Sequence, residues 1–291
     1  MRWVIGSPKP VLESILTAAE LAQKVPEIEG VPSGVEGLDE LFYTVVRERG
    51  KPVVKPLGGL PRRAAVHVTG TSDTGKSLFA EQYALAQAAR GEGVVFVTVE
   101  TPAPFVDAGL EQRRLAMGLA RDVLEGITLV DAASHGVLRE DLPTLFATLD
   151  AAFEATGARH LVVDSLTGLY EAREMTARLI VRKVYLYAKE KDVTAVFTSQ
   201  KRSSHEELSA EAAGGYAVSH ILDATIVLAK RLVMTQAQSK LWGVPLGEVV
   251  RFLRIDGCRL SGHDTKTHHL ELLPEGLLRV GPPIGASSSE A

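Results

Sequence analysis

Some features are scarce in this sequence, and each shortage narrows the class of protein. The 291-residue chain has one cysteine, Cys258, which excludes an internal disulfide and a cysteine-rich zinc module. No apolar run approaches the about 20 residues of a membrane-spanning helix, and the N-terminus lacks a secretory hydrophobic region. We therefore expect no membrane contact and a cytoplasmic location.

A strong excess of one charge is also missing. The net charge of −4 gives no general attraction to nucleic acid or to anionic membranes, so such contacts would need a local basic patch. A hydrophobic content of 45% excludes wholesale disorder. The length fits one α/β domain with additions or two small domains, and the absence of an internal repeat argues against a tandem double domain.

The most informative segment is a glycine-rich loop. Residues 70–77 read Gly-Thr-Ser-Asp-Thr-Gly-Lys-Ser and satisfy the phosphate-loop pattern G-x-x-x-x-G-K-[ST]. The glycines let backbone N–H groups point at phosphate oxygens, Lys76 brings positive charge to the β- and γ-phosphates, and the Ser77 hydroxyl suits Mg²⁺. We predict that Mg-ATP is bound by Gly70, Thr71, Ser72, Asp73, Thr74, Gly75, Lys76, Ser77 and Leu78.

Around this loop the chain alternates between strand-like and helix-like patterns. An apolar run precedes the loop, and apolar residues at helical spacing follow it through Arg90. Such alternation predicts a P-loop α/β core, a mostly parallel sheet flanked by helices. Predicted strands are Val94–Glu100, Ile127–Asp131, His160–Asp164 and Thr194–Gln200, with helices over 142–153 and 171–191. After Gly214 we expect antiparallel strands joined by turns, at Ala224–Leu228, Val249–Ile255 and His268–Leu273.

These patterns divide the chain into three parts. Residues 1–30 form an N-terminal helical segment, with Leu12, Ile15 and Leu16 on one helical stripe. Residues 31–281 form the ATPase domain. The Ser- and Ala-rich tail, 282–291, is predicted to be disordered.

Three polar residues end predicted strands and are candidates for the chemistry. Asp164 ends an apolar strand 88 residues after Lys76, the form of a Walker B acid that holds Mg²⁺ through water beside Ser77. Glu100 is placed to orient and deprotonate the attacking water. Gln200 is placed to sense the γ-phosphate and move the following loop. The alternative for each is an ordinary strand-terminal group facing solvent.

These residues carry a resemblance to the RecA superfamily, and within it to the KaiC/RadA branch. The match covers residues 31 to about 280 and is closest to single-domain KaiC-like and RadA-paralogue proteins. The segments that resemble family motifs are 31–41 (“STGIxGLDEL”), 58–61 (“GGLP”), 96–102 (“FVTFEETP”), 214–220 (a Gly-Gly segment) and 254–265 (“KMRGxxHD”).

The resemblance implies a RecA-like fold and a homo-oligomeric ring, a hexamer, with ATP held between subunits. It implies that Glu100 is the catalytic glutamate, assisted by Lys76, and that Gln200 is the sensor. Two departures stand out: Asp73 lies inside the phosphate loop, and a Lys-x-Arg pair that acts on the neighbouring subunit's nucleotide is here Arg254-Ile255-Asp256. Arg254 or Arg259 is then the candidate cation in trans, and we expect slow turnover.

Two segments are candidates for a partner. Residues 42–57 contain two β-branched runs around Arg49-Gly50 and carry a local charge of +3, which predicts a basic hairpin. It would contact single-stranded DNA or an acidic protein, or else be an edge hairpin whose charges only prevent aggregation. The loop 201–215 occupies the DNA-gripping position of RecA-type recombinases, but its charges balance and it has no aromatic residue.

Three functions remain open from the sequence. The first is a KaiC-like ring ATPase with slow, Mg-dependent hydrolysis at subunit interfaces. The second is a RadA-paralogue accessory protein of DNA recombination and repair, in which ATP gates single-strand binding. The third is a nucleotide-dependent signalling scaffold or autokinase.

Overall fold

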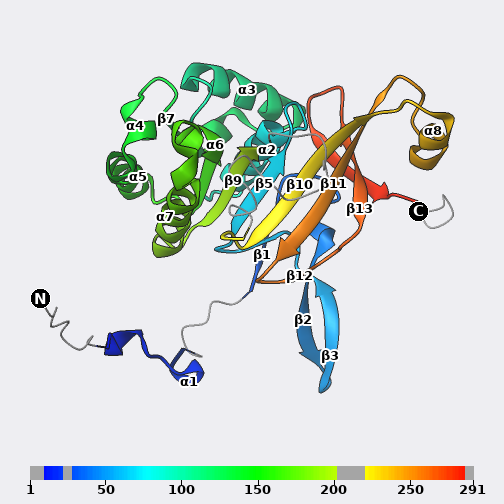
Figure 1. Cartoon of the computed structure of the whole chain (residues 1–291). Coiled ribbons are helices and arrows are strands. Elements are labelled where there is room, and N and C mark those ends of the chain that lie inside the picture. The colour runs from blue at the N-terminus through cyan, green and yellow to red at the C-terminus, as the bar shows by residue number, and fades with distance from the viewer. Residues whose placement is uncertain (1–9, 22–27, 202–219, 286–291) are drawn as a thin grey trace, which may run out of the picture.

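The computed structural model describes residues 10–21, 28–201 and 220–285. Its centre is a nine-stranded sheet in the order β14-β13-β11-β10-β5-β9-β8-β6-β7 (Figure 1). From β10 to β7 neighbouring strands are parallel, whereas β11, β13 and β14 are antiparallel additions. The predicted mostly parallel sheet with C-terminal antiparallel strands is therefore confirmed.

The parallel strands are apolar because helices cover both of their faces. They are β5 (Ala65–Gly70), β6 (Val94–Thr98), β7 (Ile127–Asp131), β8 (His160–Asp164), β9 (Thr194–Gln200) and β10 (Ala224–Leu232). The antiparallel strands are β11 (Val249–Cys258), β13 (Thr267–Leu272) and β14 (Leu278–Pro283).

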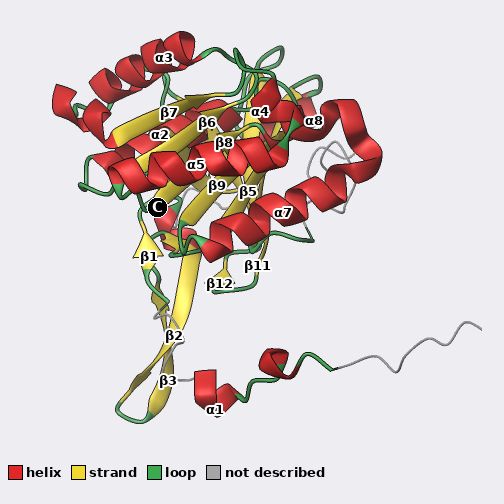
Figure 2. Cartoon of the chain, turned by 90° about the vertical axis from the view of Figure 1, so that its left-hand side faces the viewer, coloured by secondary structure: helices red, strands yellow, loops and turns green. Residues whose placement is uncertain are grey.

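Two apolar cores lie on opposite faces of the sheet. One core is built on α2 (Lys76–Ala88) and α3 (Ala103–Ala116). The other is built on α5 (Leu142–Thr156), α6 (Leu166–Tyr170) and α7 (Ala177–Glu190), and Figure 2 shows α5 and α7 crossing that face. Shorter helical segments are η2 (Asp39–Leu41), η3 (Arg121–Gly126), α4 (Val137–Glu140) and η4 (Glu171–Thr176).

Several expectations for the C-terminal part are wrong in detail. β10 was expected to be antiparallel, but it pairs in parallel with β5 on one side and antiparallel with β11 on the other. It is therefore the last strand of the parallel set. A helix, α8 (Gln236–Trp242), interrupts the β10–β11 connection, where we expected a turn. β14 reaches Pro283, two residues beyond the predicted domain boundary, because its main chain pairs with β13. Residues 286–291 lie outside the described part.

The predicted hairpin at 42–57 is confirmed. β2 (Phe42–Glu48) pairs with β3 (Lys51–Pro56) around Arg49-Gly50, both of which have positive φ, as a tight two-residue turn requires. The hairpin projects from the body in both views (Figures 1 and 2), and β12 (Gly262–His263) pairs with β2 at its base. A small sheet of β1 (Gly30–Val31) and β4 (Leu60–Pro61) lies beside it.

The single N-terminal helix is not formed. The described part contains only η1 (Leu12–Ser14) and α1 (Ala18–Leu21), and the predicted stripe of Leu12, Ile15 and Leu16 is exposed. Thr17 and Glu20 form a reciprocal capping box, which starts a new helix at residue 18. Without a surface to cover, a short amphipathic segment does not sustain one long helix. None of the described helices is long and apolar enough to cross a membrane.

Candidate functional site

The carboxyl ends of four adjacent strands bring the candidate residues to one edge of the sheet. β5, β9, β8 and β6 are neighbours in that order and all run parallel. The phosphate loop follows β5, Gln200 ends β9, Asp164 ends β8, and Glu100 lies two residues beyond β6. Residues spread over 130 positions of the sequence therefore meet in one place.

Two glycines fix the path of the phosphate loop. A Cβ on Gly70 would collide with the carbonyl oxygen of Leu228 on β10, so the loop can leave β5 only from a glycine. Gly75 has φ +102°, a left-handed conformation, and directly precedes α2. The turn exposes the amino-terminal N–H groups of α2, a 13-residue helix, to the space above the loop.

Lys76 is the cation inside the loop. Its Nζ donates to the carbonyl oxygen of Thr71 at 2.7 Å, and Thr74 Oγ1 donates to the same oxygen at 3.0 Å. Burial lowers the pKa of Lys76, whereas the negative charges of Asp164 and Glu100 raise it. Partial desolvation strengthens the attraction of Lys76 for an anion, and the two carboxylates favour its protonated, charged form.

Asp164 lies at the end of β8, against the side chain of Thr198, which donates to its Oδ1. Burial raises the pKa of Asp164, hydrogen bonds from Thr198 and Ser77 lower it, and the charge of Glu100 raises it further. A desolvated carboxylate next to a second carboxylate and a serine hydroxyl is a set of hard oxygen donors, which fits a divalent cation such as Mg²⁺.

Glu100 is exposed at the rim of the site. Its Oε1 accepts a hydrogen bond from Ser165, a buried residue that directly follows Asp164. Gln200 is exposed too, and its backbone N–H donates to Thr167 Oγ1 at 2.9 Å. The loop 202–219 after it lies outside the described residues, so the prediction that Gln200 acts on this loop stays a prediction.

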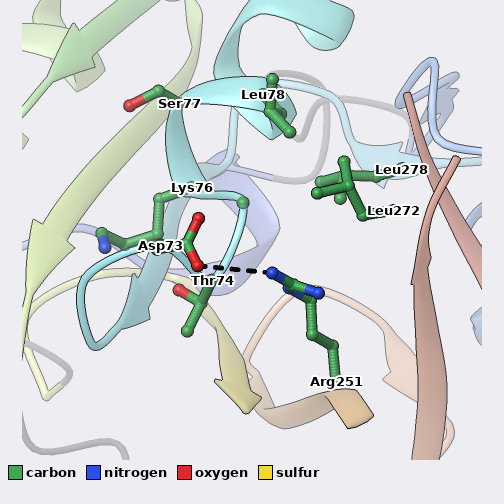
Figure 3. Close-up of a pocket in the computed structure, with 9 residues that line it drawn as sticks. Asp73, Thr74, Lys76, Ser77, Leu78, Arg251, Leu272 and Leu278 are labelled. Atoms are coloured by element: carbon green, nitrogen blue, oxygen red, sulfur yellow. Dashed lines mark hydrogen bonds and ion pairs between the residues drawn. The ribbon is translucent and has the colours of Figure 1, made fainter. Parts of the chain in front are cut away.

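Asp73 does not point its charge at the phosphate-binding backbone. Its carboxylate accepts from Lys230 Nζ at 2.9 Å and lies 3.4 Å from Arg251 Nη2 (Figure 3 shows the Arg251 contact). The hydrogen bond from Lys230 and the charges of both cations lower the pKa of Asp73. The repulsion expected from an acid within the loop is thus offset by two cations that no sequence pattern indicated.

A cavity of about 200 Å³ opens beside the loop. Arg251 and three leucines, Leu78, Leu272 and Leu278, line it together with residues 73–77 (Figure 3). Leu272 and Leu278 come from β13 and β14, so the antiparallel additions form its apolar wall. The sequence missed these residues, as it missed Thr198, because strand pairing rather than sequence distance brings them to the loop. Ser165 could have been predicted to lie in the site, because it directly follows Asp164 in the sequence.

Neither candidate for action in trans lines this cavity. Arg254 donates to Asp256, two residues along the same strand, and Arg259 donates to the carbonyl oxygen of His220. In the single chain both arginines therefore have partners of their own, and their action on a neighbouring subunit stays a prediction. The described residues contain no cluster of three or more His, Cys, Asp or Glu side chains that could hold a metal.

A phosphate loop between the first parallel strand and its helix, with acids at the ends of adjacent strands, defines a RecA-like P-loop protein. The chain belongs to the KaiC family of ATPases, since the family model described as “ATPase: KaiC” matches residues 31–283. The resemblance drawn from the sequence motifs is therefore confirmed.

Individual relatives agree with this assignment. The chain is 27% identical over 268 residues to a UPF0273 protein of Methanopyrus kandleri, covering 88% of this chain and 93% of that protein. It is 30% identical to a UPF0273 protein of Pyrobaculum aerophilum, over 68% of each chain. The crystal structure of a KaiC-like protein from Pyrococcus horikoshii is 25% identical, with a TM-score of 0.66, and covers 88% of this chain and 100% of that one.

Proposed function

We propose that this protein binds ATP with Mg²⁺ and hydrolyses it slowly at the interfaces of a homo-oligomeric ring. The observation that carries the proposal is the convergence of the charges of Asp164 and Glu100 on Lys76, a residue of the phosphate loop that also lines the leucine-walled cavity. The leucine wall of this cavity suits a base or a ribose, and the loop suits the phosphates.

The roles of the residues follow from their chemistry. Lys76 and the N-terminus of α2 stabilise phosphate charge, while Ser77 and Asp164 would hold Mg²⁺, which neutralises phosphate charge when bound. Glu100, oriented by Ser165, accepts the proton of the attacking water. Asp256 engages Arg254, which leaves that guanidinium less able to act on a neighbour's nucleotide. Because a cation in trans contributes roughly 10³–10⁵ in rate, this pairing supports slow turnover.

The test is phosphate release from ATP, measured with and without single-stranded DNA and alongside the mass of the assembly. Wild type should bind ATP and release phosphate. Lys76→Ala should lose binding, whereas Glu100→Gln should retain it and release phosphate about 100-fold more slowly. ATP binding without phosphate release in the wild type would favour the scaffold or autokinase, and absence of ATP binding would refute the proposal.

DNA recombination or repair is the second candidate, and the projecting hairpin favours it. Arg47, Arg49 and Lys51 are exposed near its tip, while Lys55 is paired with Glu48. Exposed cations on a projection can reach a phosphate backbone. DNA that accelerates ATP turnover would select this function over a ring ATPase with a protein partner.

A further inference from the structure

Two cations face each other across neighbouring strands beside the phosphate loop. Lys230 on β10 and Arg251 on β11 are direct partners in the antiparallel register. Like charges in such positions repel, and the repulsion is relieved when an anion lies between them. The pair is therefore an anion-binding arrangement in its own right.

Asp73 supplies the anion in this structure. Its Oδ2 accepts from Lys230 at 2.9 Å and lies 3.4 Å from Arg251. Asp73 has φ +60°, a conformation that non-glycine residues adopt uncommonly, and its side chain is 69% exposed. An exposed carboxylate at the tip of a loop can leave these cations without the cost of breaking a packed core.

Two of the three charges line the cavity beside the phosphate loop. Asp73 and Arg251 line the same cavity as Lys76 and Ser77 (Figure 3). Lys230 lies in a separate surface depression that it shares with Thr71 and Ser72 of the loop. A phosphate chain held by the loop would thus come close to the cations that Asp73 engages.

Building on the nucleotide binding proposed above, we propose that Asp73 competes with the nucleotide phosphates for Lys230 and Arg251, and so sets the affinity of the site. The cation pair binds the polyphosphate, and the carboxylate holds the same pair until the polyphosphate displaces it. A triphosphate carries more charge than a diphosphate and competes better, so the device also favours ATP over ADP.

Asp73→Asn is the decisive variant. Asparagine tolerates the left-handed conformation, so the loop keeps its path while the negative charge is lost. We expect the Kd for ATP, measured by titration calorimetry, to fall about tenfold, with a smaller gain for ADP and a loss of the gain at high salt. Asp73→Gly is a second variant with the same expectation, and thermal melting checks that both fold.

The double variant Asp73→Asn/Arg251→Gln separates competition from simple neutralisation. If the cations bind phosphate, removing Arg251 cancels most of the gain. If they only neutralise Asp73, the double variant binds ATP as tightly as Asp73→Asn, and the proposal is overturned. An unchanged Kd in Asp73→Asn overturns it as well.

Inorganic tripolyphosphate tests the competition apart from nucleotide recognition. Tighter tripolyphosphate binding by Asp73→Asn, together with no ATP binding by any variant, would refute the proposed ATPase and retain the competition. Binding of ATP by the wild type, with no gain for either ligand in Asp73→Asn, would refute the competition alone.

Discussion

The charged side chains around the phosphate loop differ in how far they are buried and in which charges lie beside them. Lys76 is partly buried beside two carboxylates, whereas Asp73 is exposed and paired with two cations. Solvent screens the exposed charges more than the partly buried ones, so we expect Asp73 to have a smaller effect on ligand binding than Lys76.

At the residue scale, Asp164 is the most direct test of the metal site. Asp164→Asn removes the charge of the strand-end carboxylate. We therefore expect the factor by which Mg²⁺ lowers the Kd for ATP to be about tenfold smaller in the variant than in the wild type. Binding without Mg²⁺ should not weaken, because a repulsive charge near the phosphates is lost. Calorimetry with Mg²⁺ and with a chelator measures both.

Thr198→Val is the matched control for this variant. It deletes the hydroxyl that donates to Asp164 but keeps the carboxylate. Its Mg²⁺ dependence should therefore stay close to that of the wild type. Equal Mg²⁺ dependence in Asp164→Asn and the wild type would remove Asp164 from the metal site.

At the scale of elements, a polar network joins the amino ends of β5, β6 and β8, at the edge of the sheet opposite the candidate site. His160 at the start of β8 hydrogen-bonds Tyr83 of α2 at 2.8 Å and Glu92 at 2.8 Å, and Glu92 pairs with Arg62 through two contacts of 3.0 and 3.2 Å. The bonds to Arg62 are the largest cause of a pKa of about 2 for Glu92. Burial lowers the pKa of His160, which favours the neutral ring that bridges Tyr83 and Glu92, although the charge of Glu92 acts in the opposite direction.

This network predicts a specific dependence of stability on pH. Because the pKa of Glu92 is depressed from 4.5 in the folded protein, its contribution is present above pH 4.5 and is lost as the pH falls toward about 2. Glu92→Gln should lower the free energy of unfolding by about 1–2 kcal/mol near neutral pH, allowing for solvent screening. The deficit should shrink near about pH 3.

Urea denaturation of both proteins at the two pH values measures the deficit. Glu154→Gln, an exposed glutamate on α5, is the control and should show none. A deficit of equal size at both pH values would mean that Glu92 acts through packing rather than through its charge.

The hairpin is the second element with a testable role. Reversal of Arg47, Arg49 and Lys51 to glutamate should abolish single-stranded DNA binding at low salt if the hairpin contacts DNA. The matched control reverses Arg178, Arg182 and Lys183, which are equally exposed on α7. Fluorescence anisotropy of a labelled oligonucleotide measures both, and unchanged binding in the hairpin variant would leave it as an edge hairpin.

The melting temperature of the charge-reversed protein distinguishes a loss of DNA binding from a loss of stability. Val45 and Val54 face each other in the register and are 63% and 62% exposed, so the projecting part covers little core. The charge-reversed protein should therefore melt within a few degrees of the wild type. Surface substitutions usually change the free energy of unfolding by no more than about 0.5 kcal/mol.

At the scale of the whole molecule, action between subunits can be tested by mixing variants. Glu100→Gln removes the proposed base, and Arg254→Ala removes the cation proposed to act on a neighbouring subunit. If both defects lie at a shared interface, a mixed ring contains interfaces with an intact Glu100 and an intact Arg254. Mixing should then restore part of the phosphate release that each variant lacks alone.

The controls for mixing are the two separate variants and the concentration dependence of the mass. Restored activity should appear only at concentrations at which the protein assembles. If Arg254→Ala alone hydrolyses ATP as fast as the wild type, Arg254 has no part in turnover, and Arg259 becomes the remaining candidate.

The sequence predicted an element correctly where the pattern of a few neighbouring residues decides its structure, and failed where tertiary contacts decide it. β7, β8 and β9 are found at the predicted residues because strands of a parallel sheet covered by helices are short, mostly apolar runs. The helix α8 was missed although Thr235 and Gln238 form a capping box, a local signal that was present. The N-terminal helix was wrong because an apolar stripe predicts a helix only where another surface covers it.

By itself the sequence determined the phosphate loop and the parallel core, and it indicated Lys76, Ser77, Asp164 and Glu100 as candidates for the site. These depend on patterns within a few residues of each position. Only the tertiary structure decided what surrounds them: Ser165 on Glu100, the leucine wall from β13 and β14, and Asp73 between Lys230 and Arg251. Those contacts depend on which strands pair and in which register, and contacts between residues 65 to 178 positions apart leave no mark in a local pattern.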